Sequence, residues 1–204
     1  KGFSDFWQVD GKAEVAKVGT WEPVPGYSLF KAVKETLGDL PIIAEDLGNI
    51  DAKARKLLAD CGYPGMKILE FGFFDVTGKS IDAPHPCIPN SVAYTGTHDN
   101  EVVNGWYNNL EPEQQEYVDA YSNRKPIEKV SQAMLRMLFA SVSDSAIASL
   151  QYILDLGVEI RMNMPSTIGG NWEWRMKADD LTEERKDFLT KLTLLYQRGN
   201  EQHD

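Results

Sequence analysis

Two acidic residues, Glu45 and Asp46, stand side by side at the end of an apolar segment. The segment, residues 40–44, is rich in Ile, which is the pattern of a buried parallel strand. In α/β folds the carboxyl ends of strands face the active site, so these acids would be open to a substrate and partly desolvated by their neighbours. Desolvation raises the pKa of a carboxyl group and can keep it protonated as a general acid near neutral pH. The structural alternative is that one of the two acids caps the next helix or pairs with an arginine.

A second polar cluster, His98, Asp99 and Asn100, follows another strand candidate, residues 91–95. An imidazole can donate a hydrogen bond to a sugar hydroxyl, and a carboxylate can orient hydroxyls or stabilise a developing cation. The alternative is that Asp99 or Asn100 caps a helix that begins near Glu101. One His beside one Asp is too sparse for a set of metal ligands, so we expect no metal here.

A third segment, residues 161–175, contains a Gly pair followed by Asn171, Trp172 and Trp174. Such residues suit the binding of sugars, because indole rings stack on flat sugar faces and amides bridge hydroxyl groups. The alternative is that the two Trp side chains are core residues packed under a loop.

The elements that must position these residues alternate between short apolar runs and longer amphipathic ones. The patterns predict strands over residues 40–44, 66–71, 91–95 and 158–162. They predict a long loop over 75–90 and helices over 27–37, 52–60, 111–122, 126–140, from 143 or 144 to 156, and from 182 towards Gly199. Strand, loop and helix in succession favour parallel βαβ units, so the expected fold class is α/β in one domain. Four strands fit an incomplete barrel or a small open sheet.

Composition narrows the class of partner. The chain has 204 residues, of which 42% are hydrophobic and 25% are charged, as in soluble globular proteins. A net charge of -10 argues against nucleic acid and anionic membranes as partners, and no apolar run approaches the roughly 20 residues that span a bilayer. Cys61 and Cys87 are too few for a disulfide framework, and the first residues lack an apolar signal core, so we expect free thiols and a cytoplasmic location. The length is below the roughly 250 residues of a complete (β/α)₈ barrel.

Read in order, these segments resemble the 4-α-glucanotransferases, the amylomaltase or disproportionating-enzyme family. The matching residues extend along nearly the whole chain. They are 1–3, Trp7, 19–21, 43–48, 64–69, 94–100 and 170–175.

The resemblance implies a (β/α)₈ barrel that cleaves an α-1,4 bond, holds a glycosyl-enzyme and passes the sugar chain to another glucan. It assigns the acid/base role to Glu45, and it assigns to Asp99 the binding of the distorted sugar's hydroxyls in the transition state. The sugar-contacting positions that it implies are Phe71, His98, Asn171 and, beside the acid, Asp46. The implied substrates are α-1,4-glucans and maltooligosaccharides, with no cofactor, in the cytoplasm or, in a plant, in the plastid.

The family's nucleophilic aspartate lies in an Asp-His-Phe-Arg-Gly-Phe segment, and Lys1 stands at the arginine of that segment. We therefore expect residues 1–204 to be the C-terminal half of the barrel, inactive alone, with the nucleophile and the N-terminal half absent from this sequence. Two departures lie at the edge of the site: Glu101 and Val102 stand where the family usually has Asp-Thr, and Ser166 stands where it has Gly. The alternatives are a non-catalytic glucan-binding module, or a related α-glucan hydrolase.

Overall fold

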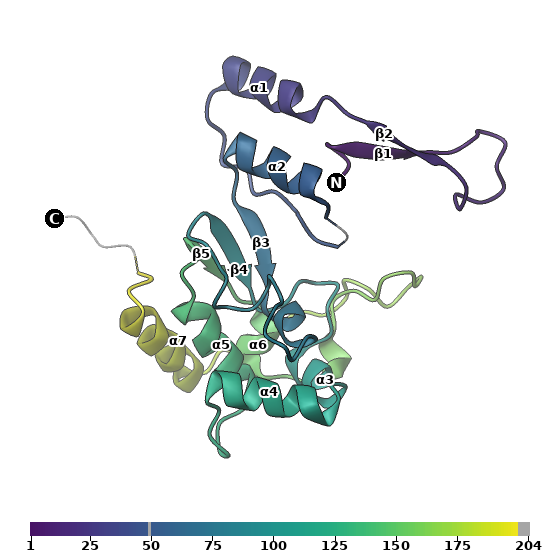
Figure 1. The fold of residues 1–204 in the computed structure, drawn as a ribbon. Coiled ribbons are helices and arrows are strands. Elements are labelled where there is room, and N and C mark those ends of the chain that lie inside the picture. Colours follow the sequence, from purple (N-terminus) through teal and green to yellow (C-terminus); the bar gives the residue numbers. More distant parts are fainter. Residues whose placement is uncertain (49, 200–204) are drawn as a thin grey trace. The chain divides into compact units, whose positions relative to one another are not determined.

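The computed structural model describes residues 1–48 and 50–199 and forms two compact units, Lys1–Met66 and Lys67–Asp204 (Figure 1). The elements are α-helices, short 3-10 helices and short strands, which agrees with the expected α/β class. In the described part of the chain, no helix has the length and apolarity needed to cross a membrane.

The first unit contains an antiparallel hairpin and two helices that contact each other. Trp7 and Trp21 face each other across the hairpin, with ring centroids 5.1 Å apart. The side chain of Asp51 begins the second helix by accepting a hydrogen bond from the Ala54 amide, and Gly38, with a φ of 78°, ends the first helix. Both helices therefore form as the sequence predicts. The elements are β1 (Asp5–Gln8), β2 (Thr20–Pro23), α1 (Gly26–Leu37) and α2 (Ala52–Cys61).

The second unit packs helices against a three-stranded sheet with the order β3-β4-β5. Strands β4 and β5 are parallel, with Ala93 opposite Ala146, which agrees with the expected parallel βαβ connection. The elements are β3 (Gly65–Ile68), which begins at the boundary of the units, η1 (Leu69–Phe73), β4 (Ser91–Tyr94), α3 (Val103–Asn108), α4 (Pro112–Ser122), α5 (Val130–Ala140), β5 (Ser145–Ile147), α6 (Leu150–Leu154), η2 (Val158–Ile160) and α7 (Glu183–Leu195).

Helix α5 is the centre of the second unit, because it contacts α3, α4, α6, α7 and β5 (Figure 1). Most of its apolar residues are buried, and Met134, Leu135 and Leu138 belong to one continuous core. Phe73 and Trp106 pack edge to face in this core, with ring centroids 6.2 Å apart. This core supports the carboxyl end of β4, from which the second polar cluster extends.

Residues 40–44 do not form the predicted strand. Within the described residues, their only strand-like pairing is one parallel bridge between Ala44 and Gly65. A strand needs a continuous ladder of backbone hydrogen bonds, which an apolar sequence alone does not provide.

The predicted helix after Ser143 is also wrong at its start. Residues 145–147 instead pair with β4 as strand β5, and the helix is limited to α6. The predicted strand over 158–162 is wrong as well, because Val158–Ile160 forms a 3-10 turn. Helix α5 begins at Val130 and not at 126, because residues 125–128 close a turn in which the Glu128 amide donates to the Lys125 carbonyl.

Candidate functional site

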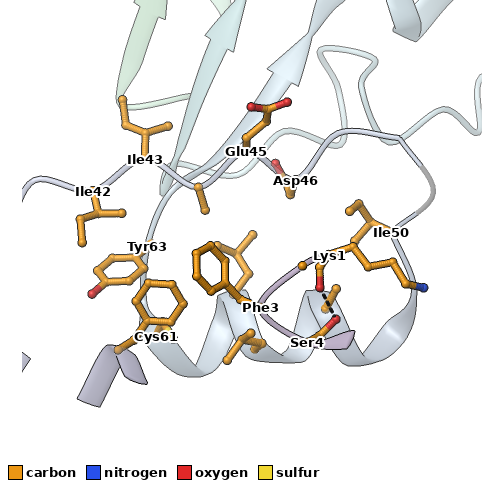
Figure 2. A pocket seen from close by; sticks show the side chains of 16 residues that line it. Lys1, Phe3, Ser4, Ile42, Ile43, Glu45, Asp46, Ile50, Cys61 and Tyr63 are labelled. Carbon is orange, nitrogen blue, oxygen red and sulfur yellow. Dashed lines mark hydrogen bonds between the residues drawn. The ribbon is translucent and has the colours of Figure 1, made fainter. Parts of the chain in front are cut away.

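Glu45 and Asp46 differ in their surroundings within the first unit. Glu45 is exposed, and Figure 2 shows its carboxylate pointing away from the rings of Phe3 and Tyr63. The partial desolvation expected for Glu45 is therefore not found in this chain. Asp46 is half-buried, and its Oδ1 accepts a hydrogen bond of 2.7 Å from the Met66 amide.

The contact of Asp46 with β3 requires a glycine opposite it. A Cβ atom at Gly65 would lie 2.7 Å from Asp46 Oδ2, which is too close for a non-bonded contact. Asp46 therefore ties the 42–46 segment to β3, and neither it nor Glu45 caps the next helix, because the cap of α2 is Asp51. The contact of Asp46 with a sugar hydroxyl stays a prediction.

A cavity of about 380 Å³ lies beside these two acids within the first unit (Figure 2). Its wall is largely aliphatic and aromatic. Cys61 is one of the lining residues, and burial raises the pKa of its thiol, which fits a packed residue better than a nucleophile. The apolar lining residues are Phe3, Phe30, Ile42, Ile43, Ala44, Ile50, Ala54, Leu57, Leu58 and Tyr63.

In the second unit, the chain leaves β4 through a tight loop. The side-chain oxygen of Asn100 accepts hydrogen bonds of 2.8 Å from both the amide and the hydroxyl of Thr97. This closes the loop on itself and sets His98 and Asp99 at its tip. The alternative role as a helix cap is not observed for Asp99 or Asn100, because α3 begins at Val103 after an extended Val102.

The side chains of His98 and Asp99 are both about half exposed, at 52% and 50%. His98 Nε2 lies 3.4 Å from Asp99 Oδ1, and the imidazole packs on the indole of Trp172 with ring centroids 4.8 Å apart. Trp172 is itself 50% exposed and has a φ of 65°, which is uncommon for a residue with a bulky side chain. Trp172 is therefore not a core residue, and the second and third polar segments meet at this ring pair.

Asn171 and Phe71 make different contacts. Asn171 accepts a hydrogen bond from the Met164 amide at 2.9 Å and donates one to the Thr167 hydroxyl at 3.1 Å, so its amide group closes its own loop. Phe71 lies on η1 with its ring 6.3 Å from that of Phe74. The structure thus joins His98, Asp99 and the 171–172 loop, and sugar contacts by Asn171 and Phe71 stay predictions.

One buried acid was not anticipated as part of this region. Glu70 is 1% exposed on η1, accepts a hydrogen bond from the Tyr152 hydroxyl, and has its amide bonded to the Thr95 carbonyl at 3.3 Å. Burial raises the pKa of its carboxyl to about 8, against the lowering effect of the Tyr152 hydrogen bond. Its signal in the sequence was an acid inside the apolar run 66–71.

Comparison with known proteins identifies the family. A family model described as 4-alpha-glucanotransferase matches residues 1–182. The chain belongs to the 4-alpha-glucanotransferase family. The resemblance seen in the sequence is therefore confirmed at the level of the family.

Individual relatives agree with this family. The chain is 50% identical over 202 residues to the 4-alpha-glucanotransferase of Streptococcus pneumoniae serotype 4. The matched region covers 98% of this chain and 40% of the relative. It is 39% identical over 206 residues to the chloroplastic/amyloplastic 4-alpha-glucanotransferase of Arabidopsis thaliana, covering 97% of this chain and 35% of that protein. The chain thus spans about 40% of the length of the first curated 4-alpha-glucanotransferases that it matches.

Solved structures agree as well. The amylomaltase of Streptococcus agalactiae in complex with acarbose matches with a TM-score of 0.94 and 55% identity, over 98% of this chain and 40% of the other. The amylomaltase of Corynebacterium glutamicum matches with a TM-score of 0.62 over 84% of this chain and 30% of the other. At 18% identity the second match supports the fold alone.

Proposed function

We propose that this chain is the C-terminal part of a (β/α)₈ enzyme that transfers α-1,4-glucan segments between maltooligosaccharides. The observation that carries the proposal is the 50% identity to a 4-alpha-glucanotransferase over 98% of the chain. Because the chain spans only 40% of that relative, we propose that it works as part of a longer polypeptide whose other residues complete the barrel and supply the nucleophile.

In the proposed reaction Glu45 protonates the departing glycosidic oxygen and later removes the proton from the acceptor hydroxyl. Its exposure leaves the carboxyl open to a substrate, and the desolvation suited to a general acid would come from the bound glucan and the rest of the enzyme. Asp99 holds hydroxyls of the distorted sugar and favours the oxocarbenium-like transition state through its negative charge. His98 and Trp172 present a donor and a flat ring beside it.

The expected ligands follow from the same proposal. They are α-1,4-glucans and maltooligosaccharides, which are neutral, so that carboxylates and aromatic rings can bind them without a positive field. The related amylomaltase of Streptococcus agalactiae was solved with acarbose. We expect the complete protein that contains this chain to bind acarbose as well.

The test is disproportionation of maltotriose by the complete protein, with Glu45→Gln as the variant. We expect this variant to lose transfer while it keeps its affinity for maltoheptaose in calorimetry, because the amide keeps the shape of the side chain but cannot exchange a proton. Glu35→Gln, on the exposed surface of α1, is the matched control and should keep full activity. Full transfer by Glu45→Gln would contradict the assigned role.

Two further measurements separate the alternatives. The 204-residue chain alone should show no transfer, and sustained turnover by it would refute the proposal that other residues supply the nucleophile. In the complete protein, transfer conserves the number of reducing ends, whereas hydrolysis increases it. Maltoheptaose binding by the complete protein without any turnover would instead indicate a glucan-binding module.

A further inference from the structure

Two residues of the third segment, Arg161 and Asn163, donate hydrogen bonds to Asp99. Arg161 Nη2 donates to the Asp99 carbonyl at 2.6 Å, and Nη1 donates to Glu101 Oε2 at 3.1 Å. The Asn163 amide donates to the His98 carbonyl at 3.2 Å, and Asn163 Nδ2 donates to Asp99 Oδ1 at 2.6 Å. The loop that carries Asp99 is thus tied to residues more than 60 positions later in the chain.

These contacts divide into a part that fixes the backbone and a part that fixes one carboxylate. Arg161 binds the main chain of Asp99 and, through Nε, the Asn163 carbonyl at 3.0 Å. The loop is also closed by Asn100 and Thr97, independently of Asn163. Among the described residues, Asn163 donates the only hydrogen bond to the carboxylate of Asp99, and His98 Nε2 lies 3.4 Å from the same Oδ1 atom, beyond good hydrogen-bond distance. Removal of that side chain would therefore free the Asp99 rotamer and leave the backbone in place.

The geometry leaves the other carboxylate oxygen available. Asp99 Oδ2 accepts no hydrogen bond from the residues that the structure describes, and the side chain is 50% exposed. A carboxylate held through one oxygen presents the other in a defined direction. We propose that Asn163 is a positioning residue, which orients Asp99 towards the hydroxyls of the bound glucan while Arg161 holds the backbone beneath it. This inference rests on the proposed function of Asp99.

Loss of the Asn163 side chain should lower the rate of catalysis more than the stability of the fold. An exposed hydrogen bond contributes little to stability, because water replaces the lost partner. A misplacement of about 1 Å at a reacting centre can lower a rate on the order of 100-fold. Asn163→Ala in the complete protein should therefore lower kcat about 10- to 100-fold and change KM by less than about threefold, with an unchanged unfolding midpoint.

Asn104→Ala is the matched control. Asn104 Nδ2 donates to Asp155 Oδ1 at 3.3 Å and to the Leu156 carbonyl at 3.2 Å, so this variant also removes an Asn–Asp hydrogen bond from the second unit. It should keep wild-type kcat. Wild-type kcat in Asn163→Ala, or an equal loss in both variants, would overturn the proposal.

A change of pH gives a signature that a purely structural role would not produce. In Asn163→Asp, two carboxylates would stand at hydrogen-bond distance, near His98, Glu101 and Arg161, and would share one proton at lower pH. The protonated Asp would again donate to Asp99. The activity of Asn163→Asp relative to wild type should therefore rise as the pH falls towards about 5, while that of Asn163→Ala stays constant. A constant ratio for Asn163→Asp would overturn the proposal.

The orientation of Asp99 can be measured without activity. Crystal structures of the wild-type protein and Asn163→Ala should show different Asp99 side-chain rotamers, and an identical rotamer would overturn the proposal. If the wild-type protein transfers no glucan, the proposed function fails, and this structural comparison still decides the role of Asn163.

Discussion

Replacement of Glu70 by Gln should stabilise the protein more strongly as the pH rises. Glu70 is 1% exposed, and its carboxyl lies against Gly96, where a Cβ atom would approach it to 3.1 Å. Burial is the main cause that raises its pKa to about 8, and the nearby Glu101 adds to this, while the Tyr152 hydroxyl and Arg161 act in the opposite direction. The folded protein therefore keeps a proton on Glu70 at neutral pH, whereas the unfolded chain, with a pKa near 4.5, has lost it.

The size and sign of the effect follow from this difference in bound protons. Between pH 4.5 and 8 the folded state binds more protons than the unfolded state, so stability falls as the pH rises, by about 1.4 kcal/mol per pH unit. A raised pKa in a carboxyl thus costs nothing at low pH and reaches its full cost of about 5 kcal/mol above pH 8. Gln does not titrate, so the advantage of Glu70→Gln over wild type should grow by about 3 kcal/mol between pH 5.5 and 7.5.

Urea denaturation followed by circular dichroism at several pH values measures this difference. Glu116→Gln, at an exposed position on α4, controls for the loss of one carboxylate. Tyr152→Phe removes the hydrogen bond that lowers the pKa of Glu70, so the pKa should rise further. The stability of this variant should therefore continue to fall with rising pH beyond the pH at which the stability of the wild type levels off. A Glu70→Gln advantage that is the same at every pH would show that Glu70 is ionised in the folded protein and would refute the reasoning.

Two further substitutions test local contacts by urea denaturation. Gly65→Ala should destabilise the protein by about 1–3 kcal/mol, because its Cβ would lie 2.7 Å from Asp46 Oδ2. The loss should be smaller when Asp46→Ala is also present, and strict additivity of the two changes would contradict this contact. Thr182→Ala should lower the free energy of unfolding by about 1 kcal/mol, because the Thr182 hydroxyl accepts a hydrogen bond from the Arg185 amide at the start of α7. Thr190→Ala, at an exposed position within α7, is the control and should not destabilise the protein. Equal losses in the two variants would argue against a capping role.

Several helix ends were predicted well because their signals are local, although the starts of α5 and α6 were not. Gly38 ends α1, Thr182 begins α7, and the positions of α2 and α4 agree with the patterns within a residue or two. Strands were predicted less well. Residues 40–44 are more apolar than residues 145–147, yet only the second set pairs along its length, because β4 lies beside it.

The candidate site was predictable in part. The sequence pointed to Glu45, His98, Asp99 and Asn171, and the structure links His98 and Asp99 to the third segment through Trp172. Arg161 and Asn163 lay inside that segment without an assigned role, since nothing in their spacing shows that they reach the loop at 97–101. The hydrogen bond that Asp46 accepts from the Met66 amide could not be predicted from the sequence either.

The sequence by itself determined the α/β class, several helix ends and the resemblance to the 4-α-glucanotransferases, because these depend on residue types at short spacing and on motifs in a fixed order. Only the tertiary structure decided which carboxylates are buried, bound or open. Glu45 is exposed, Asp46 is bonded to β3, Asp99 is held by Asn163, and Glu70 is buried against Tyr152. The physical reason is that the state of a carboxyl depends on the groups within a few ångströms of it, and folding brings those groups from distant parts of the chain.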